Sequence, residues 1–168
     1  MSRHILLVGM MGAGKTTAGE LVASILGWPY RDSDADVERA TGMTVPEMFV
    51  AQGEAAFREA EAEALAQACA EPEPSVISVA GGAVLAESNR ALMRKSGTVV
   101  WLRAQPETLI ERVGEGVGRP LLEDDPATVL TRLATERAGL YEEVADVIID
   151  VDAMSPEEVV AAIIKEAA

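Results

Sequence analysis

The chain has 168 residues, of which 28 are acidic and 14 are lysine or arginine, so its formal net charge is −14. Such an acidic surface repels phosphate backbones and anionic lipid, which argues against nucleic-acid and membrane partners and favours small molecules or other proteins. The length is typical of one domain, and 49% apolar residues with only 4% aromatic residues predict a packed, mainly aliphatic core.

In chain order, short apolar runs alternate with helical patterns. Such continuous apolar strands separated by helices are typical of an α/β fold whose parallel sheet is covered on both faces. Residues 114–126 (GEGVGRPLLEDDP) contain three glycines and two prolines without periodicity, which predicts a mobile loop. The expected strands are 4–9, 30–34, 75–80, 98–104 and 146–152, and the expected helices are 16–27, 36–42, 46–53, 53–70, 87–95, 106–113, 127–144 and one capped by Ser155.

The N-terminal apolar run is too short and too interrupted by glycine for a signal peptide, and no run approaches the length of a membrane span. The single cysteine, Cys69, permits no internal disulfide and lies in an alanine-rich helical pattern, where we expect plain packing. His4 is expected to flank the first strand without a chemical role. These features fit a cytoplasmic location, which we expect.

The stretch GMMGAGKTT (residues 9–17) lies between the first strand and the first helix and matches the phosphate-binding pattern GxxxxGK[ST]. Glycines allow the backbone to direct its N–H groups at phosphate oxygens, and the helix N-terminus adds partial positive charge. Lys15 would reach the β- and γ-phosphates, and the Thr16 hydroxyl would bind Mg²⁺. Thr17 is either a further nucleotide contact or an ordinary first-turn threonine. The absence of an Asn-Lys-x-Asp motif argues against a GTPase.

Two carboxylates, Asp32 and Asp34, follow the second strand. If the strand extends to Asp34, both point to the same side of it, at the sheet edge where ligands bind in this fold class. They could then serve Mg²⁺ and a substrate hydroxyl, or they could form a solvated turn in which Asp34 caps the next helix.

Several other residues have two readings from spacing alone. Arg58 lies near Glu54 and Glu61 on one helix, which is typical of a surface ion-pair array. The pair Gly81-Gly82 permits either close approach of a ligand or a simple turn. The remaining candidates are Arg119, a lid arginine for phosphoryl transfer or an exposed loop residue, and Arg112 and Arg137, unremarkable by themselves.

Taken together, these segments resemble the shikimate kinases. GMMGAGKTT, DSD, TGMTVPEMFVAQGEAAFR, AGGAVL, GRPLL and ERAGLYEEVAD occur in that family's order and spacing, from His4 to about Pro156. The resemblance implies a three-layer P-loop NTPase fold with a five-stranded parallel sheet in the order 2-3-1-4-5. It also implies one kinase domain over residues 1–168, with a substrate-binding segment at about 34–62 and a mobile lid at about 114–126.

The resemblance further implies transfer of the γ-phosphate of ATP to the 3-hydroxyl of shikimate, in aromatic amino-acid biosynthesis, with Mg²⁺ as cofactor. Asp34 would be the general base, and Arg58 and Arg137 would bind the substrate carboxylate. The catalytic residues implied by the resemblance are Lys15, Asp34 and Arg119, and the Mg²⁺ ligands are Thr16 and Asp32. The implied nucleotide-binding residues are Gly12, Ala13, Gly14, Lys15, Thr16, Thr17, Arg112, Arg119 and Pro156. The implied shikimate-binding residues are Asp34, Arg58, Gly81, Gly82 and Arg137.

One departure concerns Ala80, where the family usually has a first glycine before Gly81-Gly82, so the substrate pocket could differ. A gluconate kinase is the nearest alternative enzyme, but the His-Pro pair common in that family is absent after Asp34. A non-catalytic nucleotide-binding regulator would not need two arginines for an acid. We expect a monomer whose partners are small-molecule substrates.

Overall fold

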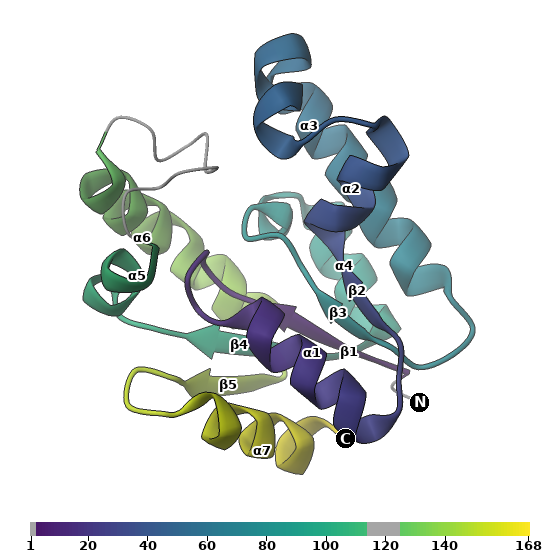
Figure 1. Cartoon of the computed structure of the whole chain (residues 1–168), viewed down its shortest axis with the longest axis vertical. Coiled ribbons are helices and arrows are strands. Elements are labelled where there is room, and N and C mark those ends of the chain that lie inside the picture. Colours follow the sequence, from purple (N-terminus) through teal and green to yellow (C-terminus); the bar gives the residue numbers. More distant parts are fainter. Residues whose placement is uncertain (1–2, 114–124) are drawn as a thin grey trace.

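The computed structural model describes residues 3–113 and 125–168 and contains a five-stranded, all-parallel sheet (Figure 1). The strands lie in the order β2-β3-β1-β4-β5, which confirms the order that the family resemblance implied. Their bounds are β1 (His4–Val8), β2 (Tyr30–Asp32), β3 (Val76–Ser78), β4 (Gly97–Arg103) and β5 (Val147–Asp150).

Helices cover both faces of this sheet. Helices α1 and α7 contact each other and lie in front of it in Figure 1, while α4, which contacts α3 and α6, lies behind it. The bounds are α1 (Lys15–Leu26), α2 (Ser33–Thr41), α3 (Val45–Ala70), α4 (Glu87–Ser96), α5 (Pro106–Val113), α6 (Pro126–Val144) and α7 (Pro156–Ala167), with a short 3-10 turn, η1 (Ala83–Leu85), that the sequence did not predict.

The central strand explains the apolar runs of the sequence. All five residues of β1 are buried, because helices exclude water from both faces of the sheet. Burial of aliphatic side chains from β1, β3, β4 and β5 and from the facing helices forms one continuous core, the main favourable contribution to folding, and Tyr30 of β2 packs against it. This core holds the strands' carboxyl ends together at one edge.

The second strand is shorter than predicted. It ends at Asp32, and Ser33 begins α2, so Asp32 and Asp34 do not share a strand face as expected. The reason is local: the Asp32 side chain accepts hydrogen bonds from the backbone N–H groups of Asp34 (2.9 Å) and Ala35 (3.2 Å). A carboxylate that satisfies these N–H groups is an N-cap, and α2 begins at Ser33, three residues before the predicted start at residue 36.

Helices α2 and α3 form a small unit with a core of its own. The two helices predicted at 46–53 and 53–70 are joined into α3, with a kink at Gly53, whose φ is +87°. The apolar side chains between α2 and α3 pack separately from the main core, around Val37, Met48, Phe57 and Ala64. This unit overhangs the carboxyl end of the sheet (Figure 1).

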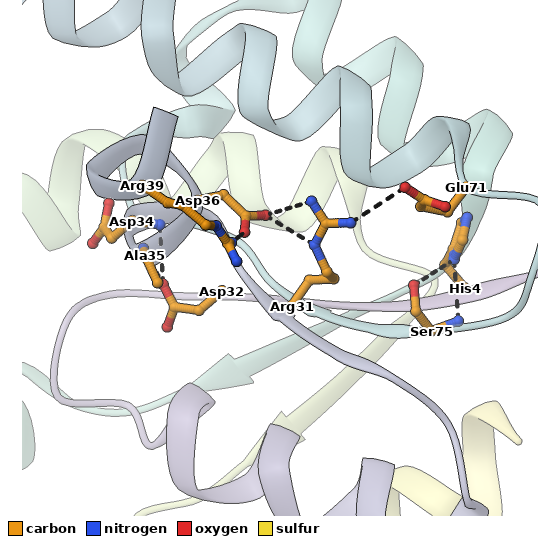
Figure 2. Close-up of polar contacts among 9 residues, drawn as sticks. All are labelled: His4, Arg31, Asp32, Asp34, Ala35, Asp36, Arg39, Glu71 and Ser75. Atoms are coloured by element: carbon orange, nitrogen blue, oxygen red, sulfur yellow. Dashed lines mark hydrogen bonds and ion pairs between the residues drawn. The ribbon is translucent and has the colours of Figure 1, made fainter. Parts of the chain in front are cut away.

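His4 is structural, as expected, and it joins distant segments. The backbone N–H of Ser75 donates to its Nδ1 (3.2 Å), so Nε2 carries the hydrogen and donates to the Cys69 carbonyl (3.3 Å). Figure 2 shows the imidazole beside Ser75. Burial lowers the pKa of His4, which favours the neutral form of the ring. Cys69 itself is buried, as the prediction of plain packing requires.

The predicted lid at 114–126 falls mainly on residues 114–124, which lie outside the described residues, and so does Arg119. Pro126, the last residue of the predicted lid, is the first residue of α6. Within the described part of the chain, no helix is long and apolar enough to cross a bilayer.

Candidate active site

One cavity of about 430 Å³ lies between the carboxyl ends of the strands and the α2–α3 unit. Parallel strands place their carboxyl ends at one edge, so residues far apart in sequence meet there. Most predicted site residues line this cavity: Gly12, Gly14, Lys15, Thr16, Thr17, Asp32, Asp34, Arg58, Gly81, Gly82 and Arg137.

The glycines of the loop between β1 and α1 are required by backbone conformation. Gly9, Gly12 and Gly14 have φ values of +145°, +88° and +96°, which residues with a side chain rarely adopt. A Cβ at Gly9 would also lie 2.7 Å from the Leu102 carbonyl oxygen. The loop therefore curls tightly before α1 begins, with Ala13 buried beneath it.

Lys15 and Thr16 stand at the start of α1. The Lys15 ammonium donates hydrogen bonds to the carbonyl oxygens of Gly9 (2.7 Å) and Met10 (3.0 Å), which hold it over the loop. The Thr16 hydroxyl faces Oδ2 of Asp32 at 3.5 Å. A cation, a hydroxyl and the first turn of a helix thus face the same space, an arrangement suited to phosphate oxygens.

Asp32 links the two ends of the cavity. Its Oδ1 caps α2 and so fixes the turn that carries Asp34, while its Oδ2 faces Thr16. Ser33 adds a second attachment, because its hydroxyl accepts a hydrogen bond from the Ala80 backbone N–H at 2.8 Å. Asp34 therefore lines the cavity from a helix that is attached to β2 and to the segment after β3.

Arg58 is more than a member of a surface array. It pairs with Glu54, as expected, but its shortest contacts are with Glu61, where Nη1 lies 3.0 Å from Oε1 and 3.1 Å from Oε2. The Glu61 side chain is only 1% exposed. Burial raises the pKa of Glu61 to about 7, although the positive charge of Arg58 opposes that rise. On the other side, Arg58 lies against Gly82, where a Cβ would stand 2.6 Å from Cζ.

Arg137 is not a solvated helix residue, since it is only 2% exposed. Among the described residues, its Nε has no hydrogen-bond partner, and Nη1 lies 3.4 Å from the position of a Cβ at Gly81. The neighbouring Tyr141 hydroxyl donates to the Gly81 carbonyl at 2.6 Å and holds this turn. A buried guanidinium with an unsatisfied N–H is costly unless an anion accepts from it, so the geometry favours an acidic ligand.

The remaining predicted residues lie at the margin. The Arg112 guanidinium approaches the carbonyl oxygens of Gly12 (3.4 Å) and Ala13 (3.5 Å), behind the phosphate-binding loop. Pro156 is exposed at the first turn of α7 and does not line the cavity. Ala80 is one of the residues that line the cavity.

Sequence reasoning missed several residues that build the site. Glu61 was interpreted only as a surface partner, and its i,i+3 spacing from Arg58 was the available signal. Tyr141 and Ser33 gave no signal, because each acts through one long-range hydrogen bond. Aromatic rings of Phe49 and Phe57 also line the cavity and form its apolar wall.

Comparison with known proteins is consistent with this geometry. The family model for shikimate kinase matches residues 11–168. A shikimate kinase of Symbiobacterium thermophilum is 46% identical over 166 residues, which cover 97% of this chain and 95% of the relative. A solved shikimate kinase from Acinetobacter baumannii in complex with shikimate superposes with a TM-score of 0.94 at 35% identity, covering 98% of this chain and 92% of that one.

The gluconate kinase alternative is less well supported. A gluconokinase from Sinorhizobium meliloti has a TM-score of 0.58 at 22% identity, covering 95% of this chain and 88% of that one, a likeness of fold alone. The match to the shikimate kinase model, by contrast, spans almost the whole chain and includes both sides of the cavity. The chain therefore belongs to the shikimate kinase family.

Proposed function

We propose that this enzyme transfers the γ-phosphate of ATP to the 3-hydroxyl of shikimate. The observation that carries the proposal is one shared cavity: the phosphate-binding residues Lys15 and Thr16 face the same space as Asp34, Arg58 and Arg137. A donor site and an acid-binding site that open into each other are what in-line phosphoryl transfer needs.

On the donor side, the backbone N–H groups of residues 12–17 and the N-terminus of α1 would bind the ATP phosphates. Lys15 would exchange its bonds to loop carbonyls for bonds to the β- and γ-phosphates. We propose further that Arg112 stacks on adenine, with Pro156 at the border of that subsite. Arg119 would close over the phosphates with the lid.

The residues present suit Mg²⁺. The Thr16 hydroxyl and the Asp32 carboxylate supply two hard oxygen donors 3.5 Å apart, and Mg²⁺ commonly takes few protein ligands together with phosphates and water. Across residues 3–113 and 125–168, no three His, Cys, Asp or Glu side chains form a complete metal site. When bound, Mg²⁺ neutralises charge on the phosphate oxygens.

On the acceptor side, Arg137 and Arg58 would bind the shikimate carboxylate, because guanidinium groups match a carboxylate with paired hydrogen bonds. The buried Nε of Arg137 supplies a donor that this carboxylate would satisfy. The rings of Phe49 and Phe57 would contact the carbon ring, and the backbone of Gly81-Gly82 would contact its hydroxyls. The positive pair thus sets where the hydroxyl lies relative to Asp34.

Asp34 is the proposed general base. It would accept the proton of the 3-hydroxyl as that oxygen attacks the γ-phosphorus, and its position is fixed by the Asp32 cap. Lys15 and Arg119 would stabilise the charge that develops on the phosphoryl oxygens. We also propose that the enzyme acts as a monomer in the cytoplasm.

The test is ADP release by the purified protein with Mg²⁺, ATP and shikimate, compared with quinate or gluconate as acceptor. We expect release that depends on shikimate and a fall in kcat of roughly 10²–10⁴-fold for Asp34→Asn. Gluconate-dependent release that exceeds the shikimate rate would instead identify a sugar-acid kinase. Folded protein without shikimate-dependent release would refute the proposal.

A further inference from the structure

Hydrogen bonds of Asp32 and Ser33 hold the turn that carries Asp34 on the side of the sheet. A further contact holds the first turn of α2 on its other side. Arg31 precedes Asp32 in β2, and successive strand residues point to opposite faces. The Arg31 side chain therefore points away from Asp32 and toward Asp36 of α2, as Figure 2 shows. This contact lies outside the cavity described above, since neither Arg31 nor Asp36 lines it.

The contact is a charged pair in a sheltered place. Arg31 Nε and Nη2 lie 3.1 and 3.0 Å from Asp36 Oδ2, and the Asp36 side chain is only 6% exposed. Arg39 also pairs with Asp36, and Arg31 Nη1 reaches Glu71 Oε1, at the end of α3, at 3.5 Å. One guanidinium thus joins β2, the first turn of α2 and the end of α3.

The pair fixes the rotation of α2. Residues of a helix are about 100° apart around its axis, so Asp34 and Asp36 project in nearly opposite directions. Asp36 is held on the strand side by Arg31 while Asp34 lines the cavity. If α2 turned away from Arg31, the buried Asp36 carboxylate would keep Arg39 but lose one of its two arginine partners, so the rotation has a cost.

We propose that Arg31 and Asp36 are positioning residues for the reaction: their ion pair holds α2 on strand β2 so that Asp34 meets the acceptor hydroxyl. Neither residue touches substrate, and both act through Asp34. The inference rests on the proposed function, since it concerns the same base. Unlike the proposed function itself, this positioning role predicts that two residues outside the cavity control kcat.

The experiment compares Asp36→Asn, which keeps the size of the side chain, with Arg31→Lys, which keeps the charge but loses the paired geometry. We expect Asp36→Asn to lower kcat for shikimate phosphorylation by about 10- to 100-fold, because small misplacement of a catalytic group has effects of this size. ATP affinity should stay unchanged. The kcat of Arg31→Lys should lie between the values of Asp36→Asn and wild type, because the retained positive charge gives partial rescue.

The control is Asp150→Asn, which removes an exposed Arg–Asp pair, with Arg103, at the ends of β4 and β5. It should leave kcat unchanged. The thermal unfolding midpoint of each variant is measured, and the activity assay is run at a temperature well below that midpoint. If Asp36→Asn and Arg31→Lys are less stable but keep wild-type kcat, the pair is only structural and the proposal is overturned. A wild-type protein inactive toward shikimate would refute the proposed function, and the positioning role with it.

Discussion

The proposed phosphate-binding side of the cavity is built largely from backbone, whereas the proposed acceptor side is built largely from side chains, several of them charged. The first side comes from one continuous stretch, residues 9–17, in which glycines at positive φ shape the loop. The second side takes Asp34 from α2, Arg58 and Glu61 from α3, and Arg137 from α6. Backbone N–H groups suit any phosphate chain, while placed side chains select one acceptor.

This difference also appears in the electrostatics. Lys15 donates hydrogen bonds to the neutral carbonyl groups of Gly9 and Met10, which phosphate oxygens would replace. Arg58 is held by the buried Glu61, so its position is set before the acceptor arrives. An acidic protein can thus bind anions, because its positive groups are held beside the proposed ligand sites.

The largest expected effect separates the two sides directly. Arg137→Ala should weaken shikimate binding by about 2–5 kcal/mol, because the charge is desolvated, and should leave ATP binding unchanged. Titration calorimetry with each ligand measures both. Arg132→Ala, at an exposed position of the same helix, is the matched control and should change neither affinity. Equal losses for ATP and shikimate would show that the sides are not independent.

The next effect is a pH dependence that belongs to the acceptor side. The pKa of Glu61 is about 7 in the folded protein and 4.5 as its ordinary value, so the folded state binds this proton more tightly between those values. The free energy of unfolding contributed by Glu61 therefore falls as pH rises from 4.5 through 7. Glu61→Gln should remove that loss, which is on the order of 2–3 kcal/mol.

Urea unfolding of wild type and Glu61→Gln at pH 5 and pH 8 checks this expectation. The difference in unfolding free energy between the two proteins should shift in favour of the variant at pH 8. Profiles that stay parallel over this range would mean that Glu61 titrates normally and that its burial does not raise its pKa.

The smallest effect tests the close packing between Arg58 and the turn after β3. Gly82→Ala places a Cβ 2.6 Å from Arg58 Cζ, so the guanidinium must move. We expect a cost of about 1–2 kcal/mol, seen as a 5- to 30-fold rise in KM for shikimate with KM for ATP unchanged. Gly139→Ala, where a Cβ would meet no atom within 4 Å, is the control. An unaltered KM would mean that Arg58 does not depend on this contact.

The sequence determined the features that depend on neighbouring residues. The glycine spacing of residues 9–17 predicted the phosphate-binding loop, and apolar runs predicted four of the five strands, the second strand having been expected from the weaker pattern of residues 30–34. The motif order predicted the family, and with it roles for Arg58 and Arg137 that their own spacing did not reveal. The predicted end of the second strand, at residue 34, was wrong, because the Asp32 side chain caps α2 and ends the strand at Asp32.

Only the tertiary structure decided which charged residues are buried and what they face. Arg132 and Arg137 are both arginines of α6, yet one is exposed and the other is enclosed beside Gly81. Glu61 and Asp36 are acidic residues on helices rich in acidic residues, and nothing in their local sequence marks them as buried. Local sequence sets backbone conformation, whereas burial and pairing of charge arise where strands and helices distant in the chain pack together.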